Sequence, residues 1–200
     1  MLYQGICQDC HVTGRHPTAF YGSGQGLTEE TSDEDYLWAD AVLASGMHVQ
    51  RARLEAIAAQ AHRFGKVAVL GGPSVSACPD YYPMYDILHV GELGDATERL
   101  FAQLDRTVER PASQIVYETR ERLALDSTRL PAYDLIDLSR YFVLNIQWSS
   151  GCPFTCEFCD IPALYGRNPR YKSPQRLLAE FGWTQEELAQ LVGASRETVN

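Results

Sequence analysis

Val67-Ala68-Val69-Leu70-Gly71-Gly72-Pro73 is the stretch that decides the fold. Its four apolar residues run straight into a Gly-Gly-Pro turn, and a short apolar run that ends in turn residues predicts a buried parallel strand. The residues before it carry an apolar stripe at helical spacing, formed by Leu54, Ile57, Ala58 and Ala61. Gly65 follows that stripe and is a candidate helix C-cap.

Two further apolar runs predict strands on either side, over residues 39–44 and 87–90, and a helical pattern follows from Ala96 to Leu104. The order strand, helix, strand, turn, strand predicts an α/β fold with a doubly wound parallel sheet. Ligands of such sheets bind at the carboxyl ends of the strands. The residues expected there are Ser45, Gly71, Gly72 and Gly91. The alternative is that these glycines only serve the turns.

A second informative stretch is Cys152-Pro-Phe-Thr-Cys156-Glu-Phe-Cys159. It follows an apolar run over residues 141–148, which is predicted to be a buried strand. Thiolates are soft ligands that select iron–sulfur clusters, zinc or copper, and three cysteines would leave one iron of a cubane open. The alternative is a structural zinc site, with Asp160 or a distant histidine as the fourth ligand.

Residues 149–161, Ser-Ser-Gly-Cys-Pro-Phe-Thr-Cys-Glu-Phe-Cys-Asp-Ile, resemble the cluster loop of the radical S-adenosylmethionine (SAM) enzymes. The resemblance implies that Cys152, Cys156 and Cys159 bind a 4Fe–4S cluster and that SAM chelates the fourth iron. It also implies that Phe158 packs near the adenine of SAM. In this family, reductive cleavage of SAM yields a 5′-deoxyadenosyl radical that abstracts a hydrogen from the substrate.

Residues 35–104 resemble the Rossmann-like cobalamin-binding domain that precedes the barrel in cobalamin-dependent radical-SAM proteins. The segments that carry this resemblance are Leu37-Trp-Ala-Asp40, Ser45-Gly-Met-His-Val-Gln50, Gly71-Gly-Pro-Ser74 and Gly91-Glu92. The resemblance implies that Ser45, Gly71, Gly72 and Gly91 line the corrinoid. The expected fold is therefore a partial Rossmann-like sheet followed by the first β/α unit of a radical-SAM barrel.

These patterns divide the chain into five parts. They are an irregular segment over residues 1–32, a cobalamin-binding-like domain over 33–105, a linker over 106–140, the start of a radical-SAM domain over 141–180, and a tail over 181–200. The tail resembles the helix-turn-helix of Crp/Fnr-type regulators. A barrel takes about 200 residues, so we expect a truncated or rearranged chain with impaired SAM cleavage.

The composition restricts the class of protein. With 200 residues, 45% of them apolar, the chain fits one or two soluble domains. The net charge of −9 argues against a broad nucleic-acid-binding surface. No apolar run is long enough for a membrane span, and the start lacks the pattern of a secretory signal. We therefore expect a cytoplasmic protein whose six cysteines are reduced.

The N-terminal segment contains Cys7-Gln-Asp-Cys-His11, which matches three motifs. CxxCH attaches c-type haem, but that attachment takes place outside the cytoplasm. Asp9, His11 and Gly14 spell the cobalamin signature DxHxxG, although the strand expected before it is missing. Cys7, Cys10 and His11 are also potential zinc ligands. We favour coincidence for the cobalamin signature.

Beyond the cluster loop, Arg167, Arg170 and Lys172 form a basic group that either faces a carboxylate or phosphate or is simply solvated. Ser173 and Pro174 are predicted to be the N-cap and the first residue of a helix.

The function expected from both resemblances is methyl transfer or other radical chemistry, with cobalamin as a further cofactor. They imply a small-molecule or lipid substrate, with hopanoids as the lipids of the branch that looks closest, and a reductant such as flavodoxin or ferredoxin. No catalytic residue is assigned. The alternatives are a metal- or redox-sensing DNA-binding regulator and a non-functional reading frame.

Overall fold

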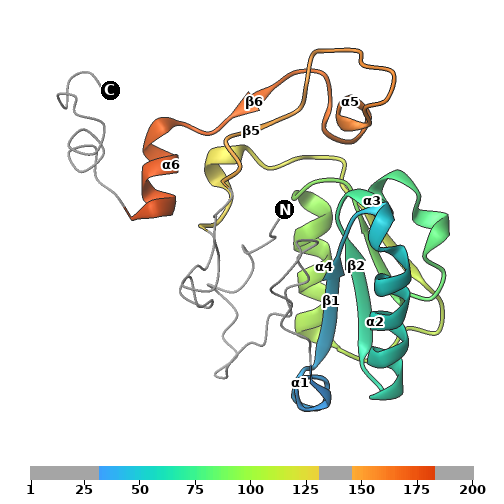
Figure 1. Ribbon diagram of the computed structural model, residues 1–200. Coiled ribbons are helices and arrows are strands. Elements are labelled where there is room, and N and C mark those ends of the chain that lie inside the picture. The colour runs from blue at the N-terminus through green and yellow to red at the C-terminus, as the bar shows by residue number, and fades with distance from the viewer. Residues whose placement is uncertain (1–31, 131–145, 183–200) are drawn as a thin grey trace.

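The computed structural model describes residues 32–130 and 146–182 (Figure 1). The first range forms a parallel sheet with helices on both faces, which confirms the predicted α/β class. The second range forms a smaller unit of short strands and helices that lies beside the sheet domain. The predicted barrel start falls in this smaller unit and stays a prediction.

Four parallel strands form the main sheet in the order β1-β2-β3-β4. They are β1 (Ala41–Ser45), β2 (Val67–Gly71), β3 (Ile87–Val90) and β4 (Ile115–Glu118). Three of them match the predicted strands closely. In the register of β1 and β2, Ser45 lies opposite Gly71, so both strands end at the same level. The sequence did not predict β4, which lies in the segment that was expected to be a linker.

The helices of the sheet domain alternate with the strands. They are α1 (Asp33–Trp38), α2 (Arg51–Arg63), α3 (Pro73–Ala77) and α4 (Asp95–Arg106), with the 3₁₀ turns η1 (His48–Gln50), η2 (Pro79–Tyr81) and η3 (Leu125–Ser127). A capping box begins α1: the Ser32 hydroxyl accepts from the Asp35 amide, and the Asp35 carboxylate accepts from the Ser32 amide.

The core has one cluster on each face of the sheet. On the first face, α2 buries its predicted apolar stripe against strand residues such as Leu70 and Leu88, and Val75 of α3 joins the same cluster. On the second face, Leu100 of α4 packs against strand residues that include Val69 and Ile87. Alternate residues of β2 therefore contribute to opposite cores, as expected for a strand buried on both sides. Figure 1 shows α2 and α4 on opposite sides of the sheet.

The connection after β3 changes face. The helices that follow β1 and β2 pack on the first face, whereas α4 follows β3 and packs on the second. All three connections step in the same direction across the sheet. Two crossovers that step the same way over opposite faces must have opposite hands. Because parallel crossovers are almost always right-handed, β4 is an unusual addition to the edge of the sheet.

The smaller unit begins with an antiparallel pair, β5 (Ser149–Ser150) and β6 (Arg170–Tyr171), and also contains α5 (Ile161–Tyr165) and α6 (Pro174–Phe181). The prediction for α6 is confirmed, because the Ser173 hydroxyl accepts from the Arg176 amide and Pro174 follows as the first helical residue. Lys172, directly after β6, and Glu180 of α6 form a buried ion pair.

Part of the predicted strand over residues 141–148 lies outside the described residues. Residues 146–148 are described and form no regular structure, and Trp148 is 57% exposed. Its ring lies 5.5 Å from that of Tyr171. In this described portion, the apolar run is therefore not a buried strand.

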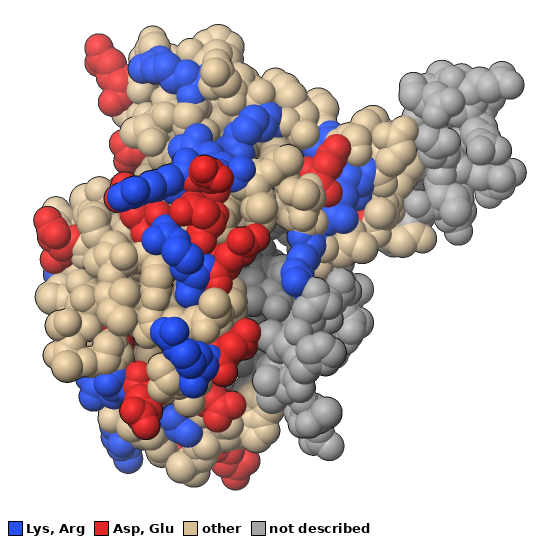
Figure 2. Space-filling view, turned by 180° about the vertical axis from the view of Figure 1, so that it is seen from behind, with Lys and Arg blue, Asp and Glu red and all other residues tan. Residues whose placement is uncertain are grey.

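Two properties of the described surface bear on function. No helix in the described ranges combines the length and the apolar character needed to cross a bilayer. Figure 2 shows basic and acidic side chains interleaved on one face of the molecule, without a broad basic area there.

Candidate functional site

Three of the four residues predicted at the strand ends lie together. Ser45 ends β1 beside Gly71 of β2, and Gly72 packs directly on Ser45. The φ of Gly72 is +92°, and a Cβ at this position would collide with the Ser45 hydroxyl oxygen. The turn after β2 thus approaches the end of β1 as closely as a glycine allows.

The fourth residue, Gly91, is joined to this turn by Ser76 of α3. The Ser76 hydroxyl donates to the Gly72 carbonyl at 2.8 Å and accepts from the Gly91 amide at 2.8 Å. The ends of β2 and β3 are therefore linked through one side chain. Sequence reasoning did not select Ser76, and a serine in a short helix carries no signal of such a bridge.

The same strand ends meet the topological condition for a ligand crevice. After Gly71 the chain passes to the first face of the sheet, and after Val90 it passes to the second. Adjacent connections that leave in opposite directions open a crevice between their strand ends, where open α/β sheets bind ligands. Gly71, Gly72 and Gly91 flank this point.

A second polar cluster borders the same edge. The Ser74 hydroxyl lies 2.7 Å from Nδ1 of His48 and also contacts the Tyr82 hydroxyl. The Ser74 amide donates to the Gly46 carbonyl at 3.2 Å. Ser74 and Tyr82 are buried, whereas His48 is exposed. Both His48 and Ser74 lie in segments that carry the cobalamin-domain resemblance, but sequence reasoning gave them no role.

The predicted cluster loop leaves β5 and returns through α5. Cys152 and Cys159 are half-buried, Cys156 is exposed, and all three are free thiols. The Cys152 amide donates to the Gly166 carbonyl at 3.0 Å, and the Cys159 amide donates to the Cys156 carbonyl at 3.2 Å. Phe158 is 92% exposed.

The chemistry of this donor set fits an iron–sulfur cluster, because three free thiols lie within eight residues of one loop. Their arrangement is not that of a formed metal site. Among the described residues, no group of three or more His, Cys, Asp or Glu side chains is gathered closely enough to hold a metal ion. The loop thus carries three candidate ligands, and the structure does not hold them around a common centre.

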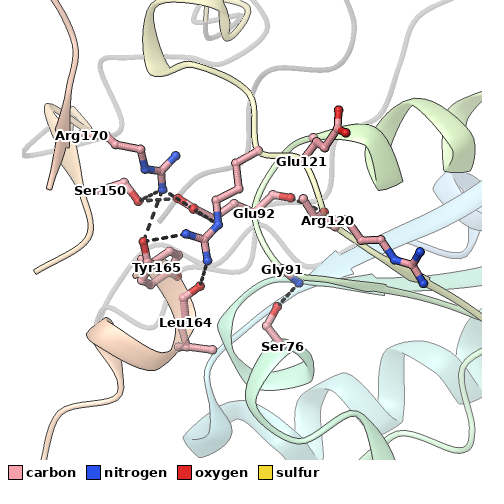
Figure 3. A network of polar contacts seen from close by, with 12 residues as sticks. Ser76, Gly91, Glu92, Arg120, Glu121, Ser150, Leu164, Tyr165 and Arg170 are labelled. Atoms are coloured by element: carbon pink, nitrogen blue, oxygen red, sulfur yellow. Dashed lines mark hydrogen bonds and ion pairs between the residues drawn. The ribbon is translucent and has the colours of Figure 1, made fainter. Parts of the chain in front are cut away.

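A carboxylate joins the sheet domain to the cluster-loop unit (Figure 3). Glu92, directly after Gly91, pairs with Arg122 at 3.0 Å and with Arg170 of β6. It also accepts a hydrogen bond from the Ser150 hydroxyl of β5. Only 9% of the Glu92 side chain is exposed. Sequence reasoning quoted Glu92 within a motif but did not predict this contact.

Arg122 extends the same network to α5. Its guanidinium donates to the carbonyls of Tyr165 at 3.1 Å and Leu164 at 3.2 Å. Burial raises the pKa of the Tyr165 phenol above 10.0, and the negative charge of Glu92 raises it further. At neutral pH, the Tyr165 phenol is therefore uncharged.

The predicted basic group is dispersed by these contacts. Arg170 pairs with Glu92 and Lys172 with Glu180, while Arg167 is exposed. The first part of the prediction is right for Arg170, which faces a carboxylate, but that carboxylate belongs to the protein. These three side chains therefore do not form one anion-binding patch.

A small cavity lies at the junction of the two units. It has a volume of about 40 Å³ and is lined by residues that include Glu92, Leu125, Tyr165 and Arg170. A water molecule needs roughly 10–15 Å³ of such volume, so the cavity suits a few waters rather than SAM or a corrinoid.

Comparison with known proteins identifies relatives over most of the chain. A hopanoid C-2 methylase of Rhodopseudomonas palustris (strain TIE-1) is 56% identical over 157 residues, which are 78% of this chain and 30% of the relative. An uncharacterized methyltransferase of Synechocystis sp. is 37% identical over 157 residues, which are 78% of this chain and 28% of that protein. The chain is homologous to methylases.

A third relative, a hopanoid C-3 methylase of Methylococcus capsulatus, is 36% identical over 59 residues, which are 26% of this chain and 12% of the relative. The chain thus spans about 30% of the length of the first two of these curated relatives. No family model matches. A solved structure, the N-terminal domain of a hypothetical protein from Thermotoga maritima, is similar with a TM-score of 0.33 and 17% identity over 46% of this chain and 76% of that one.

The kinship with methyltransferases expected from the sequence is confirmed by these relatives. The resemblance of the tail to Crp/Fnr-type regulators gains no support, since the relatives described above are methylases and methyltransferases. The predicted helix-turn-helix and the Cys7–His11 motifs lie outside the described residues.

Proposed function

We propose that this chain is the cofactor-binding part of a radical-SAM methylase and that Cys152, Cys156 and Cys159 bind a 4Fe–4S cluster. The observation that carries the proposal is the presence of three free thiols on one loop, in a chain that is 56% identical to a hopanoid C-2 methylase. Such a cluster supplies the electron for reductive cleavage of SAM.

The residues of the loop have separate roles in this proposal. The three thiolates hold three irons, and the amino and carboxylate groups of SAM occupy the fourth. Phe158 is free to cover the adenine, because 92% of its surface is exposed. The Cys152 amide is held by the Gly166 carbonyl, and the Cys159 amide is held by the Cys156 carbonyl, so Cys156 and Cys159 belong to one turn that would close on Cys152 when the cluster binds.

Cobalamin is the second cofactor in the proposal, and Ser45, Gly71, Gly72 and Gly91 form its site. These residues surround the point where adjacent connections leave the sheet on opposite faces. The absence of a Cβ at Gly72 lets the backbone lie close to Ser45, and the proposal needs the corrinoid to approach the backbone at this turn.

The methyl group would be transferred to a lipid, and hopanoids are the substrate class that two relatives are named for. Two aromatic side chains of the cluster loop, Phe154 and Phe158, are 70% and 92% exposed. They offer apolar surface next to the proposed cluster. A low-potential reductant such as flavodoxin or ferredoxin would supply the electrons.

Anaerobic reconstitution of the full chain with iron and sulfide tests the cluster. We expect about four irons per chain and a broad visible absorption band, both lost in the Cys152→Ala/Cys156→Ala/Cys159→Ala variant. Cys78→Ala, a half-buried thiol outside the loop, and Cys7→Ala/Cys10→Ala are matched controls that should keep the iron. Equal iron in the triple variant would rule out these ligands.

The same preparations separate iron from zinc. If the loop is a structural zinc site, protein isolated under anaerobic conditions will contain zinc at one ion per chain, and added SAM will leave its spectrum unchanged. A radical-SAM cluster should instead show an altered electron paramagnetic resonance (EPR) spectrum of the reduced cluster when SAM is added. For the corrinoid site, hydroxocobalamin should bind the wild-type chain and bind Gly72→Val poorly.

A further inference from the structure

Glu92 is held from two sides by different parts of the protein. On the sheet side, the Gly91 amide donates to Ser76, and the Thr119 hydroxyl donates to the Glu92 carbonyl at 2.6 Å. On the other side, the Glu92 carboxylate contacts Ser150 and Arg170 of the cluster-loop unit. The backbone around Glu92 is therefore hydrogen-bonded within the sheet domain, while its side chain contacts the cluster-loop unit.

The contacts of Glu92 reach the beginning of the cysteine loop. Ser150 lies two residues before Cys152, and Gly151 between them has a φ of +90°. A Cβ at Gly151 would lie 2.9 Å from the carbonyl oxygen of Asn168, so the chain has little room to shift there. A change in the position of Ser150 is therefore passed on to Cys152.

The charges make this contact strong. One carboxylate with 9% of its side chain exposed faces the guanidinium groups of Arg122 and Arg170. Arg170 also donates to the Ser150 hydroxyl at 3.1 Å. Loss of the buried carboxylate would leave the guanidinium groups of Arg122 and Arg170, whose side chains are 39% and 28% exposed, side by side without the charge they share.

We propose that Glu92 is a positioning residue that sets the place of the cysteine loop relative to the ends of β2 and β3. It acts through Ser150 and Arg170, not on substrate or cofactor. A continuous path of contacts then runs from Gly72 through Ser76 and Gly91–Glu92 to Ser150, two residues before Cys152. Figure 3 shows the part of this path from Ser76 to Ser150. This inference rests on the proposed cluster at Cys152, and it adds that the cluster and the proposed corrinoid site are held in register by one carboxylate.

Glu92→Gln is the decisive variant, because it keeps the shape and a hydrogen-bond acceptor for Ser150 but removes the charge. Glu121→Gln is the matched control: it removes the same charge in the neighbouring segment, where Glu121 is exposed and only its backbone contacts Asp95. Trypsin cleavage after Arg170, followed by mass spectrometry, measures how often the loop unit leaves the sheet, because the Arg170 guanidinium is held by Glu92 and Ser150 while the two units are in contact.

We expect Glu92→Gln to be cleaved at this site about tenfold faster or more than wild type, since cleavage tracks the open population, and Glu121→Gln to match wild type. The double variant Glu92→Gln/Arg170→Gln should lose less stability than the sum of the losses of the two single variants, because the two side chains act together. Equal cleavage rates for Glu92→Gln and Glu121→Gln would overturn the inference.

A spectroscopic readout separates positioning from general stability. In reconstituted Glu92→Gln, the three cysteines should still bind iron, but the EPR spectrum of the reduced cluster should differ from wild type and a chelator should remove the iron faster. A purely structural role would lower the yield of folded chain without altering the spectrum. If wild type binds no cluster, the proposed function fails, whereas normal cluster binding with an unchanged Glu92→Gln spectrum defeats only the positioning role.

Discussion

Oδ2 of Asp86 lies 2.9 Å from Nε2 of His62, and this contact joins the residue before β3 to the last turn of α2. The same oxygen accepts from the Ala68 amide at 2.8 Å, and Oδ1 lies 3.1 Å from Arg110. Only 8% of the Asp86 side chain is exposed. This carboxylate links segments near the amino ends of the strands. The candidate site lies at the other end of the sheet, where the strands finish.

Asp86→Ala should therefore lower the free energy of unfolding by about 3 kcal/mol, because the buried Ala68 amide and the half-buried His62 lose their acceptor. Urea denaturation measures the loss. Asp80→Ala, which changes an exposed carboxylate in η2, is the control and should shift stability by less than about 0.5 kcal/mol. A loss for Asp86→Ala as small as that of the control would contradict the assigned role.

His89 makes the stability of the sheet domain depend on pH. Burial in β3 lowers the pKa of His89 below 6.5, against smaller opposing effects of its own backbone hydrogen bond and of Asp95. The unfolded chain binds a proton at about pH 6.5 and the folded chain resists it. Stability should thus be complete above pH 6.5 and fall as the pH drops from 6.5 to the lower folded pKa.

Urea midpoints measured on both sides of pH 6.5 test this effect. His89→Gln should lose part of the pH slope in that range, whatever its absolute stability. An unchanged slope in this variant would show that another group causes the dependence.

Gly72 and Gly65 form a matched pair for backbone strain. Both have positive φ, +92° and +70°, but a Cβ at Gly72 collides with Ser45, whereas a Cβ at Gly65 meets open space. We expect Gly65→Ala to cost about 1 kcal/mol through strain alone, and Gly72→Ala to cost about 3 kcal/mol or more. Thermal unfolding of the two variants measures the difference. Equal losses of stability would show that the close approach of Gly72 to Ser45 does not contribute to the cost.

Substitutions of the two residues in the buried pair Lys172–Glu180 should differ in how much they destabilise the protein. Glu180 is 1% exposed and faces both Lys172 and Arg176, the latter at 3.7 Å. Glu180→Leu should therefore lower the free energy of unfolding by about 3 kcal/mol or more, and this loss should exceed that of Lys172→Met. The double variant Lys172→Met/Glu180→Leu should recover most of that loss, because apolar replacement of both partners is often nearly neutral. A strictly additive double variant would contradict this.

The sequence predicted the elements whose signal is local. The β2 run, the α2 stripe and the Ser173–Pro174 start of α6 each depend on residues within one or two turns of chain, and all three are found in the structure. Ser45 and Gly72 were placed at one edge because parallel strands end together. Their direct contact agrees with that placement.

What the sequence missed depends on long-range contacts. β4 is only four residues long, and although Ile115, Val116 and Tyr117 favour a strand, the prediction placed so short a run in the linker; its pairing with β3 is a contact between distant parts of the chain. Glu92 meets Ser150 and Arg170 across 58 and 78 residues, a distance over which no periodic pattern extends. Within the described ranges, the side chains of Cys152, Cys156 and Cys159 are not gathered around one point, and the spacing of cysteines along the chain does not determine such an arrangement.

The separation of Glu92 from its partners also bears on the order of events during synthesis. Domains generally fold as they leave the ribosome, N-terminal parts first. The sheet strands β1 to β4 precede the cysteine loop in the chain, so the carboxylate that receives the loop can be in place before the loop is made. In a ribosome-bound chain, the three thiols would then emerge beside a sheet domain that has already folded, and they could receive iron there.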